Sequence, residues 1–136
     1  MEKGRRILIV DPDANFAREF SAVLAEDDFI VEISQGITDA VSKLKDTKFD
    51  CVIMDVNLLD LKGYAAVSII KAIDQRIAVI LTANKNTKEL EKKVRSQDIF
   101  YYYLKSFDRE ELRLVVNNVF KKPAQNRYKT NSRVLY

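Results

Sequence analysis

Several residues with reactive side chains come directly after apolar runs in this sequence. Asp11, Asp55 and Lys105 each follow such a run, and Thr82 ends another. Clustered carboxylates suit a hard cation such as Mg²⁺, which takes oxygen ligands. A lysine and a hydroxyl beside them suit a phosphoryl group, and a carboxylate can be the nucleophile that accepts one as an aspartyl phosphate. These residue types indicate phosphoryl chemistry beside a bound cation.

Other kinds of site lack the residues they need. The chain has no histidine, which excludes His-based triads, His-ligated zinc and a histidine phosphocarrier role. Gly63 stands alone, so the glycine-rich patterns of dinucleotide and Walker sites are absent. A Mg²⁺-dependent hydrolase with an aspartyl nucleophile ranks low, because it wants a second acid two residues after the nucleophile, where Asn57 stands.

Five apolar runs must position these side chains, and they alternate with five stretches that favour helix. The runs cover residues 7–10, 29–31, 51–54, 77–81 and 99–104. The helical stretches cover about residues 16–24, 37–44, 63–73, 86–95 and 112–119. Strict alternation predicts an α/β fold with a doubly wound, five-stranded parallel sheet covered by helices on both faces. Ligands of such sheets bind outside the C-terminal strand ends, where the reactive residues should meet.

Length and composition indicate one ordinary globular domain. The chain has 136 residues, 47% hydrophobic and 32% charged, which suits a single soluble domain. Cys51 is the one cysteine, so no internal disulfide can form, and a reducing compartment is expected. No apolar run approaches roughly 18 residues and no signal peptide opens the chain. We therefore expect a cytoplasmic protein without a membrane segment.

The net charge of +3 is unevenly distributed along the chain. Residues 121–136 contain five basic residues and no acid, which leaves 18 bases and 20 acids in residues 1–120. The body is therefore slightly acidic, and no basic face for nucleic acid is indicated. We expect a folded domain over residues 1–122 and a basic C-terminal tail over 123–136, without direct nucleic-acid binding.

Four segments taken together resemble the receiver domain of two-component response regulators. They are residues 7–11, 52–58, 79–83 and 102–107, in that order, each at the end of a predicted strand. The resemblance covers about residues 4–121 and assigns the receiver domain to residues 1–122. It implies the flavodoxin-like (βα)5 receiver fold.

The resemblance also implies roles for single residues. Asp55 would be the phosphoacceptor, receiving its phosphoryl group from a sensor histidine kinase or a phosphotransfer protein with the help of Mg²⁺. Thr82 and Lys105 would be the catalytic residues, since Thr82 would hydrogen-bond the phosphoryl group and Lys105 would pair with it. Tyr102 falls at the position of the family's aromatic switch.

Further residues would tune or complete this site. Asn57 and Asn84 fall where the family varies the residues that set phosphate lifetime. Mg²⁺ would be held by Asp11, Asp55 and the backbone carbonyl of Asn57. Asp13 is a further candidate metal ligand, although its place before a helical stretch favours a helix N-cap.

The sequence departs from the family pattern at four places. Pro12 replaces the second acid of the acidic pair, so we expect weakened Mg²⁺ binding. Leu59 stands where a proline is usual, and Lys62–Gly63 replaces an acid followed by glycine. Ser106 replaces the proline after the conserved lysine, where the family's peptide bond is typically cis. A non-proline cis bond costs roughly 2.5–4 kcal/mol, so this bond is either trans in a changed loop or cis under strain.

Two functions follow from the resemblance. The first is a receiver domain switched by phosphorylation of Asp55 in a two-component phosphorelay. Such a domain assists its own phosphorylation and dephosphorylation but is not an ordinary enzyme. The second is a degenerate receiver that acts as a phosphorylation-independent protein-binding scaffold, which Pro12 and Ser106 favour. Either function needs a downstream protein partner or an output domain outside this sequence, and a homodimer is a further possibility.

Overall fold

The computed structural model describes residues 4–121, which form five strands and five helices in strict alternation. The strands are β1 (Arg5–Val10), β2 (Phe29–Ser34), β3 (Cys51–Asp55), β4 (Ala78–Ala83) and β5 (Tyr101–Leu104). The helices are α1 (Ala14–Glu26), α2 (Ile37–Asp46), α3 (Gly63–Ile73), α4 (Lys88–Arg95) and α5 (Arg109–Val119). All strand pairs are parallel, in the order β2-β1-β3-β4-β5. The predicted doubly wound α/β fold is confirmed.

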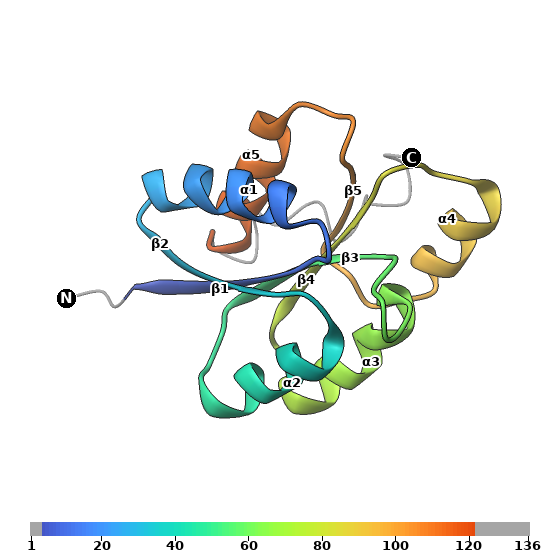
Figure 1. The fold of residues 1–136 in the computed structure, drawn as a ribbon, viewed down its shortest axis with the longest axis horizontal. Helices are drawn as coiled ribbons and strands as arrows, with labels where there is room; N and C mark the ends of the chain where they lie inside the picture. The colour runs from blue at the N-terminus through green and yellow to red at the C-terminus, as the bar shows by residue number, and fades with distance from the viewer. Residues whose placement is uncertain (1–3, 122–136) are drawn as a thin grey trace.

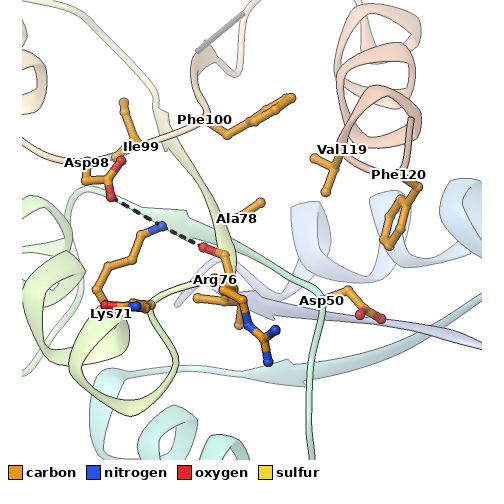
Figure 2. Close-up of a pocket in the computed structure, with 11 residues that line it drawn as sticks. Asp50, Lys71, Arg76, Ala78, Asp98, Ile99, Phe100, Val119 and Phe120 are labelled. Atoms are coloured by element: carbon orange, nitrogen blue, oxygen red, sulfur yellow. Dashed lines mark hydrogen bonds and ion pairs between the residues drawn. The ribbon is translucent and has the colours of Figure 1, made fainter. Parts of the chain in front are cut away.

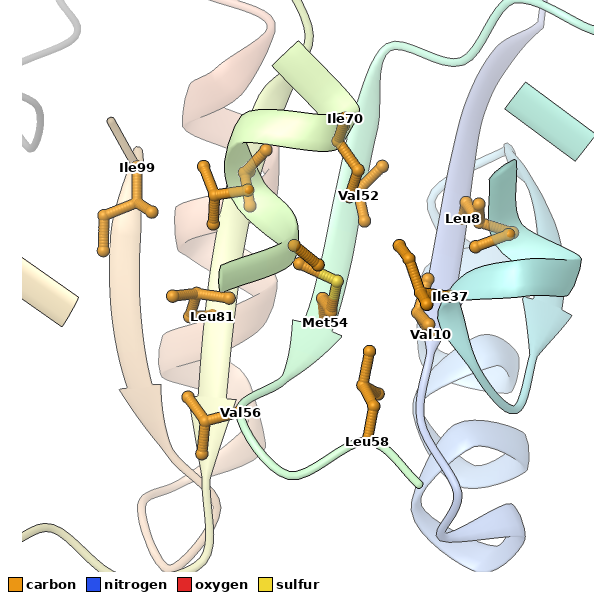
Figure 3. Packing of buried hydrophobic residues seen from close by; sticks show 14 of the residues in the cluster. Leu8, Val10, Ile37, Val52, Met54, Val56, Leu58, Ile70, Leu81 and Ile99 are labelled. Carbon is orange, nitrogen blue, oxygen red and sulfur yellow. The ribbon is translucent and has the colours of Figure 1, made fainter. Parts of the chain in front are cut away.

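Each face of the sheet has its own apolar layer. Helices α1 and α5 lie on one side of the sheet, and α2 and α3 lie on the other (Figure 1). Leu8, Val52 and Met54 point toward the α2–α3 side (Figure 3), whereas Ile7 and Ile53 pack against α1 and α5. Successive strand residues point to opposite faces, and both faces are covered. This is why the strands read as unbroken apolar runs.

Most element boundaries differ from the sequence prediction by a few residues, and local contacts explain three of the differences. β4 begins at Ala78 rather than at residue 77, and β5 begins at Tyr101 rather than at residue 99. Ile77 and Ile99 are buried, but their N–H groups donate to nearby turn carbonyls rather than to a neighbouring strand. Helix α4 begins at Lys88 because the Thr87 hydroxyl caps it, accepting the Leu90 N–H at 3.0 Å.

A loop far along the chain caps the N-terminus of α2. Gly36, at the N-cap position, makes no side-chain cap bond. The Asp60 carboxylate instead accepts the N–H groups of Ile37 and Thr38, at 3.1 and 3.2 Å. These bonds lower the pKa of Asp60. A Cβ atom on Gly36 would come within 2.9 Å of the same carboxylate oxygens. The β3–α3 loop, which follows Asp55, is thereby tied to α2.

Candidate functional site

Four polar side chains are buried together at the C-terminal edge of the sheet. Asp11 follows β1, Asp55 ends β3, Thr82 lies near the end of β4 and Lys105 follows β5. Their exposed fractions are 1%, 4%, 0% and 9%. Asp55 and Thr82 are register partners on neighbouring strands. The structure thus brings together the four residues that the sequence placed at strand ends.

The Lys105 ammonium lies between the two carboxylates. Its Nζ atom is 2.8 Å from Asp11 Oδ2 and 2.9 Å from Asp55 Oδ1. The Thr82 hydroxyl lies 3.5 Å from the same Asp55 oxygen, at the long end of hydrogen-bond distance. Buried charges require partners of this kind. Two carboxylates and one ammonium leave a net charge of about −1 at this edge.

Backbone groups fix the orientation of both carboxylates. Asp11 Oδ1 accepts the N–H of Asp13, and Asp55 Oδ2 accepts the N–H of Asn57, each at 2.8 Å. The Asp13 side chain itself is exposed and accepts two N–H groups in the first turn of α1, at 3.1 and 3.2 Å. Asp13 therefore serves as the N-cap of α1 in this structure, which is the role its place in the sequence favoured.

Burial and pairing act in opposite directions on the charges of this site. Burial raises the pKa of Asp11 above its ordinary value, because hydrogen bonding to Lys105 offsets the desolvation only in part. Burial alone would lower the pKa of Lys105, but the hydrogen bonds to Asp11 and Asp55 outweigh it and raise the pKa. The lysine is therefore charged at neutral pH and acts as the resident cation of the two acids.

The donor set is suited to Mg²⁺ with few protein ligands. One oxygen of Asp11 and one oxygen of Asp55 already point toward the same cation, the Lys105 ammonium. Within residues 4–121, no three or more acidic, cysteine or histidine side chains gather closely enough to form a larger metal cluster. Pro12 contributes no carboxylate, and Asp13 is engaged as a cap. Mg²⁺ keeps several bound waters and needs few protein ligands, so two carboxylates are suited to bind it. This site carries less negative charge than a site with three acids.

The predicted switch residue is an inward-pointing tyrosine. Tyr102 is 3% exposed, and its hydroxyl donates to the Asn86 side-chain oxygen at 2.9 Å. Burial, with a smaller contribution from the nearby Glu91 and Asp55 carboxylates, raises the pKa of Tyr102 to about 12. This hydrogen bond connects β5 to the loop before α4. Val94 is the one fully buried residue of α4, so that helix has little apolar anchoring.

The predicted tuning residues lie at the rim of the site. Asn57 is exposed, and its side-chain oxygen accepts the Lys62 ammonium at 3.0 Å. Asn84 is also exposed, and with Lys105 and Ser106 it lines a shallow surface hollow of about 360 Å³. Neither asparagine takes part in the ion pairs of Lys105.

The bond between Lys105 and Ser106 is trans, since residues 4–121 contain no cis peptide. Of the two alternatives that the sequence left open, the structure shows a trans bond in a changed loop. Sequence reasoning missed two residues that contact this loop. Phe16 stood only as part of a predicted helical stretch, and Arg109 lay between two predicted elements with no role assigned to it. Nothing in their spacing indicates that the Lys105 Nζ lies 4.6 Å from the Phe16 ring centre, or that Arg109 reaches the Lys105 carbonyl.

A larger hollow, of about 480 Å³, lies at the opposite edge of the sheet, where the strands begin. Figure 2 shows Lys71 there, donating to the Ile77 carbonyl at 2.7 Å and pairing with Asp98 at 3.6 Å. Asp50, at another side of this hollow, accepts the Arg6 N–H at 2.9 Å. Lys71 and Asp98 thus partner each other, Asp50 accepts a backbone N–H, and none of the three belongs to the Asp55 site.

Comparison with known proteins agrees with this geometry. The family described as "Response regulator receiver domain" matches residues 7–117. The chain is 30% identical over 111 residues to "Regulatory protein AtoC" of Escherichia coli (strain K12), covering 82% of this chain and 24% of that protein. The chain spans about a quarter or less of the length of the curated relatives that it matches.

Solved structures show the same fold. The solution structure of the beryllofluoride-activated NtrC4 receiver domain dimer superposes with a TM-score of 0.79 at 23% identity, covering 85% of this chain and 95% of that one. A CheY-like receiver domain protein from Methanospirillum hungatei JF-1 superposes with a TM-score of 0.80 at 17% identity, covering 95% and 98%. Separately, none of the helices formed by residues 4–121 is long and apolar enough to cross a membrane.

Proposed function

This chain belongs to the response regulator receiver domain family of two-component signalling, and from that premise we propose that phosphorylation of Asp55 switches it between two states. The observation that carries the proposal is the buried Lys105 ammonium, 2.9 Å from Asp55 and 2.8 Å from Asp11. A reactive carboxylate, a hydroxyl and a cation thus meet at one strand edge, where ligands of such sheets bind.

In the proposed reaction, an Asp55 carboxylate oxygen attacks the phosphorus of a phosphohistidine. The new O–P bond forms as the P–N bond breaks, and the imidazole leaves with the bonding electron pair. Lys105 then pairs with a phosphoryl oxygen instead of the free carboxylate, and the Thr82 hydroxyl donates to another. Asp11, Asp55 and the backbone carbonyl of Asn57 would hold Mg²⁺, which when bound neutralises charge on the phosphoryl oxygens.

The phosphoryl group would come from a sensor histidine kinase or a phosphotransfer protein. The domain assists its own phosphorylation and the later hydrolysis, so it is a phosphoacceptor rather than an ordinary enzyme. Asn57 and Asn84 are both exposed at the rim, and in this proposal they would influence how water reaches the phosphoryl group. Their substitution would change the lifetime of the phosphorylated state.

The output would pass through the side of the molecule that carries Tyr102 and α4. Weak apolar anchoring allows α4 to move at low cost, and the Tyr102–Asn86 hydrogen bond is the contact that a shift would break. The signal would reach a downstream protein partner or an output domain, and self-association is a further route, since the NtrC4 receiver domain was solved as a dimer. We expect no direct nucleic-acid contact and a cytoplasmic location.

A degenerate receiver that binds a partner without phosphorylation is the second candidate. Pro12 supports it, because a site with two carboxylates holds Mg²⁺ less tightly than one with three. Ser106 also supports it, because it replaces the proline that follows the lysine in the family pattern.

Labelling with acetyl phosphate and Mg²⁺, followed by mass spectrometry, separates these functions. We expect one labile phosphoryl group per chain, lost in Asp55→Asn and retained in the control Asp60→Asn on the same loop. Unchanged labelling of Asp55→Asn would show that Asp55 is not the phosphoacceptor. Absence of labelling in the unaltered protein would favour the scaffold.

The switch itself can be tested with beryllofluoride, a phosphoryl mimic, observed by NMR. We expect amide signals of residues 84–95 and of Tyr102 to shift, in addition to those near Asp55. Shifts confined to the surroundings of Asp55 would contradict a switch.

A further inference from the structure

The Lys105 side chain must be directed accurately, because one ammonium serves two carboxylates. Lysine has a flexible four-carbon stem and a point-like charge, so its direction depends on how its backbone and its stem are held. The Lys105 N–H donates to the Ala83 carbonyl at 2.8 Å, which ties the start of this residue to β4. The residue that follows, Ser106, is exposed, so the carbonyl end of Lys105 depends on contacts from other residues.

Arg109, the first residue of α5, holds the carbonyl group of Lys105. Its Nη1 atom donates to the Lys105 carbonyl oxygen at 2.6 Å and to the Tyr103 hydroxyl oxygen at 3.2 Å. The Tyr103 hydroxyl in turn donates to the Phe107 carbonyl at 2.7 Å. Tyr103 is fully buried, so the guanidinium is anchored to the core of the domain while it holds the loop that carries Lys105.

Phe16, in α1, orients both cations. The Lys105 Nζ lies 4.6 Å from the centre of the Phe16 ring, and the Arg109 guanidinium carbon lies 4.8 Å from it. Cations within about 6 Å of a ring centre are attracted to its face. Glu19, one turn later in α1, adds an ion pair to Arg109 at 3.3 Å. The ring therefore forms a wall that limits where the ammonium can lie.

From these contacts we propose that Arg109 and Phe16 are positioning residues that hold the Lys105 ammonium against Asp55 and Asp11. Arg109 fixes the Lys105 carbonyl, Phe16 limits the sweep of the side chain, and neither touches the reacting atoms. The effect on phosphoryl transfer rests on the proposed function of Asp55, whereas the effect on the ammonium concerns the resting protein and does not depend on phosphorylation.

The central variant is Arg109→Met, which keeps an apolar stem over Phe16 and removes the guanidinium. Its matched control is Arg113→Met, in the same helix. The Arg113 side chain is similarly exposed, at 36% against 29% for Arg109, and it pairs with Asp27 away from the site. Three properties are measured for each: the urea midpoint, the NMR signal of the Lys105 ammonium, and the initial rate of labelling by acetyl phosphate. The ammonium signal is assigned by its loss in Lys105→Met.

We expect the Lys105 ammonium signal to persist in the unaltered protein and in Arg113→Met, because a buried, paired ammonium exchanges its protons slowly with water. In Arg109→Met the signal should broaden beyond detection, and labelling should slow by about tenfold or more, since small misplacements of catalytic groups have effects of this size. Arg109→Lys, which keeps one donor for the carbonyl, should lie between the two.

Phe16→Leu provides a second variant in case Arg109→Met does not fold. It keeps an apolar side chain in the core and removes the ring face, so the same loss of signal is expected. A persisting ammonium signal with labelling within twofold of the unaltered protein, in either folded variant, would overturn the proposal. If the unaltered protein is not labelled at all, the proposed function fails, while the ammonium signal alone still decides whether these residues position Lys105.

Discussion

Lys105→Met is the substitution that tests the electrostatics of the site most directly. It keeps the volume of the side chain and removes the positive charge that two buried carboxylates share. At an effective dielectric constant of about 20, each pair at this separation contributes about 6 kcal/mol of attraction. Burying the ammonium offsets several kcal/mol of this. Loss of one partner of a buried pair should therefore cost about 3–5 kcal/mol of unfolding free energy.

The loss should depend on pH in a defined direction. Burial raises the pKa of Asp11, and the hydrogen bond from Lys105 offsets this only in part, so removal of the ammonium should raise the pKa of Asp11 further. Folding then takes up a proton, so the stability of the variant falls as pH rises through that raised pKa. The deficit relative to the unaltered protein should be full at neutral pH and should shrink as pH falls toward about 4.

Urea unfolding at pH 7 and pH 5, with and without Mg²⁺, measures both effects. Lys43→Met is the matched control, because the Lys43–Asp39 pair at 3.0 Å is much less buried than the Lys105 pairs, with side chains 31% and 59% exposed, and should contribute less than about 1 kcal/mol. Mg²⁺ should stabilise Lys105→Met, by about 1.4 kcal/mol at ten times its Kd, since the ammonium no longer competes for the acids. Equal stability of the two variants at pH 7 would refute this account of the site.

Three further predictions concern other parts of the molecule. Pro12→Asp should tighten Mg²⁺ binding by on the order of tenfold, or about 1.4 kcal/mol; superimposed NMR titrations would contradict this. Gly63→Ala should lower the unfolding free energy measured in urea by about 1–3 kcal/mol or more, because its Cβ would overlap the backbone carbonyl oxygen of Asp55. Arg113 lowers the pKa of Asp27, so the stability that this pair contributes is fully present above about pH 4 and is lost as pH falls through the lowered pKa. The difference between the urea midpoints of Asp27→Asn and the unaltered protein should therefore be full at pH 7 and shrink as pH falls below about 4.

The sequence was sufficient to predict the sheet and the meeting of its four polar residues. Apolar runs and helical stretches set the order of the elements, and parallel strands necessarily bring their C-terminal ends to one edge. Asp55 and Thr82 are therefore register partners, although 26 residues lie between them in the chain. The predicted tail, residues 123–136, lies outside the described residues.

The contacts that hold the site could not be predicted in the same way. The capping of α2 by Asp60 joins residues 23 positions apart, and local sequence rules for helix caps examine only adjacent residues. The contact of Arg109 with the Lys105 carbonyl depends on the path of a loop whose peptide bond could have been cis or trans. The order of the strands and the edge at which they end follow from periodicity and topology, whereas loop paths are fixed by side-chain contacts that only the folded chain reveals.

The charges of the site indicate when a metal ion is needed. In the resting state Asp11, Asp55 and Lys105 carry about −1 together, and one ammonium partners both acids. In the proposed reaction, transfer of a phosphoryl group to Asp55 would remove the charge of that carboxylate and add a phosphoryl charge of about −1.5 to −2, which would bring the site to about −1.5 to −2. The resting protein can therefore keep its buried acids paired without Mg²⁺, whereas the phosphorylated protein has an excess of negative charge that Lys105 alone does not balance. Pro12 lowers the negative charge of both states by one unit relative to a site with a third acid, so its main effect should be to weaken Mg²⁺ binding while leaving the resting ion pairs intact.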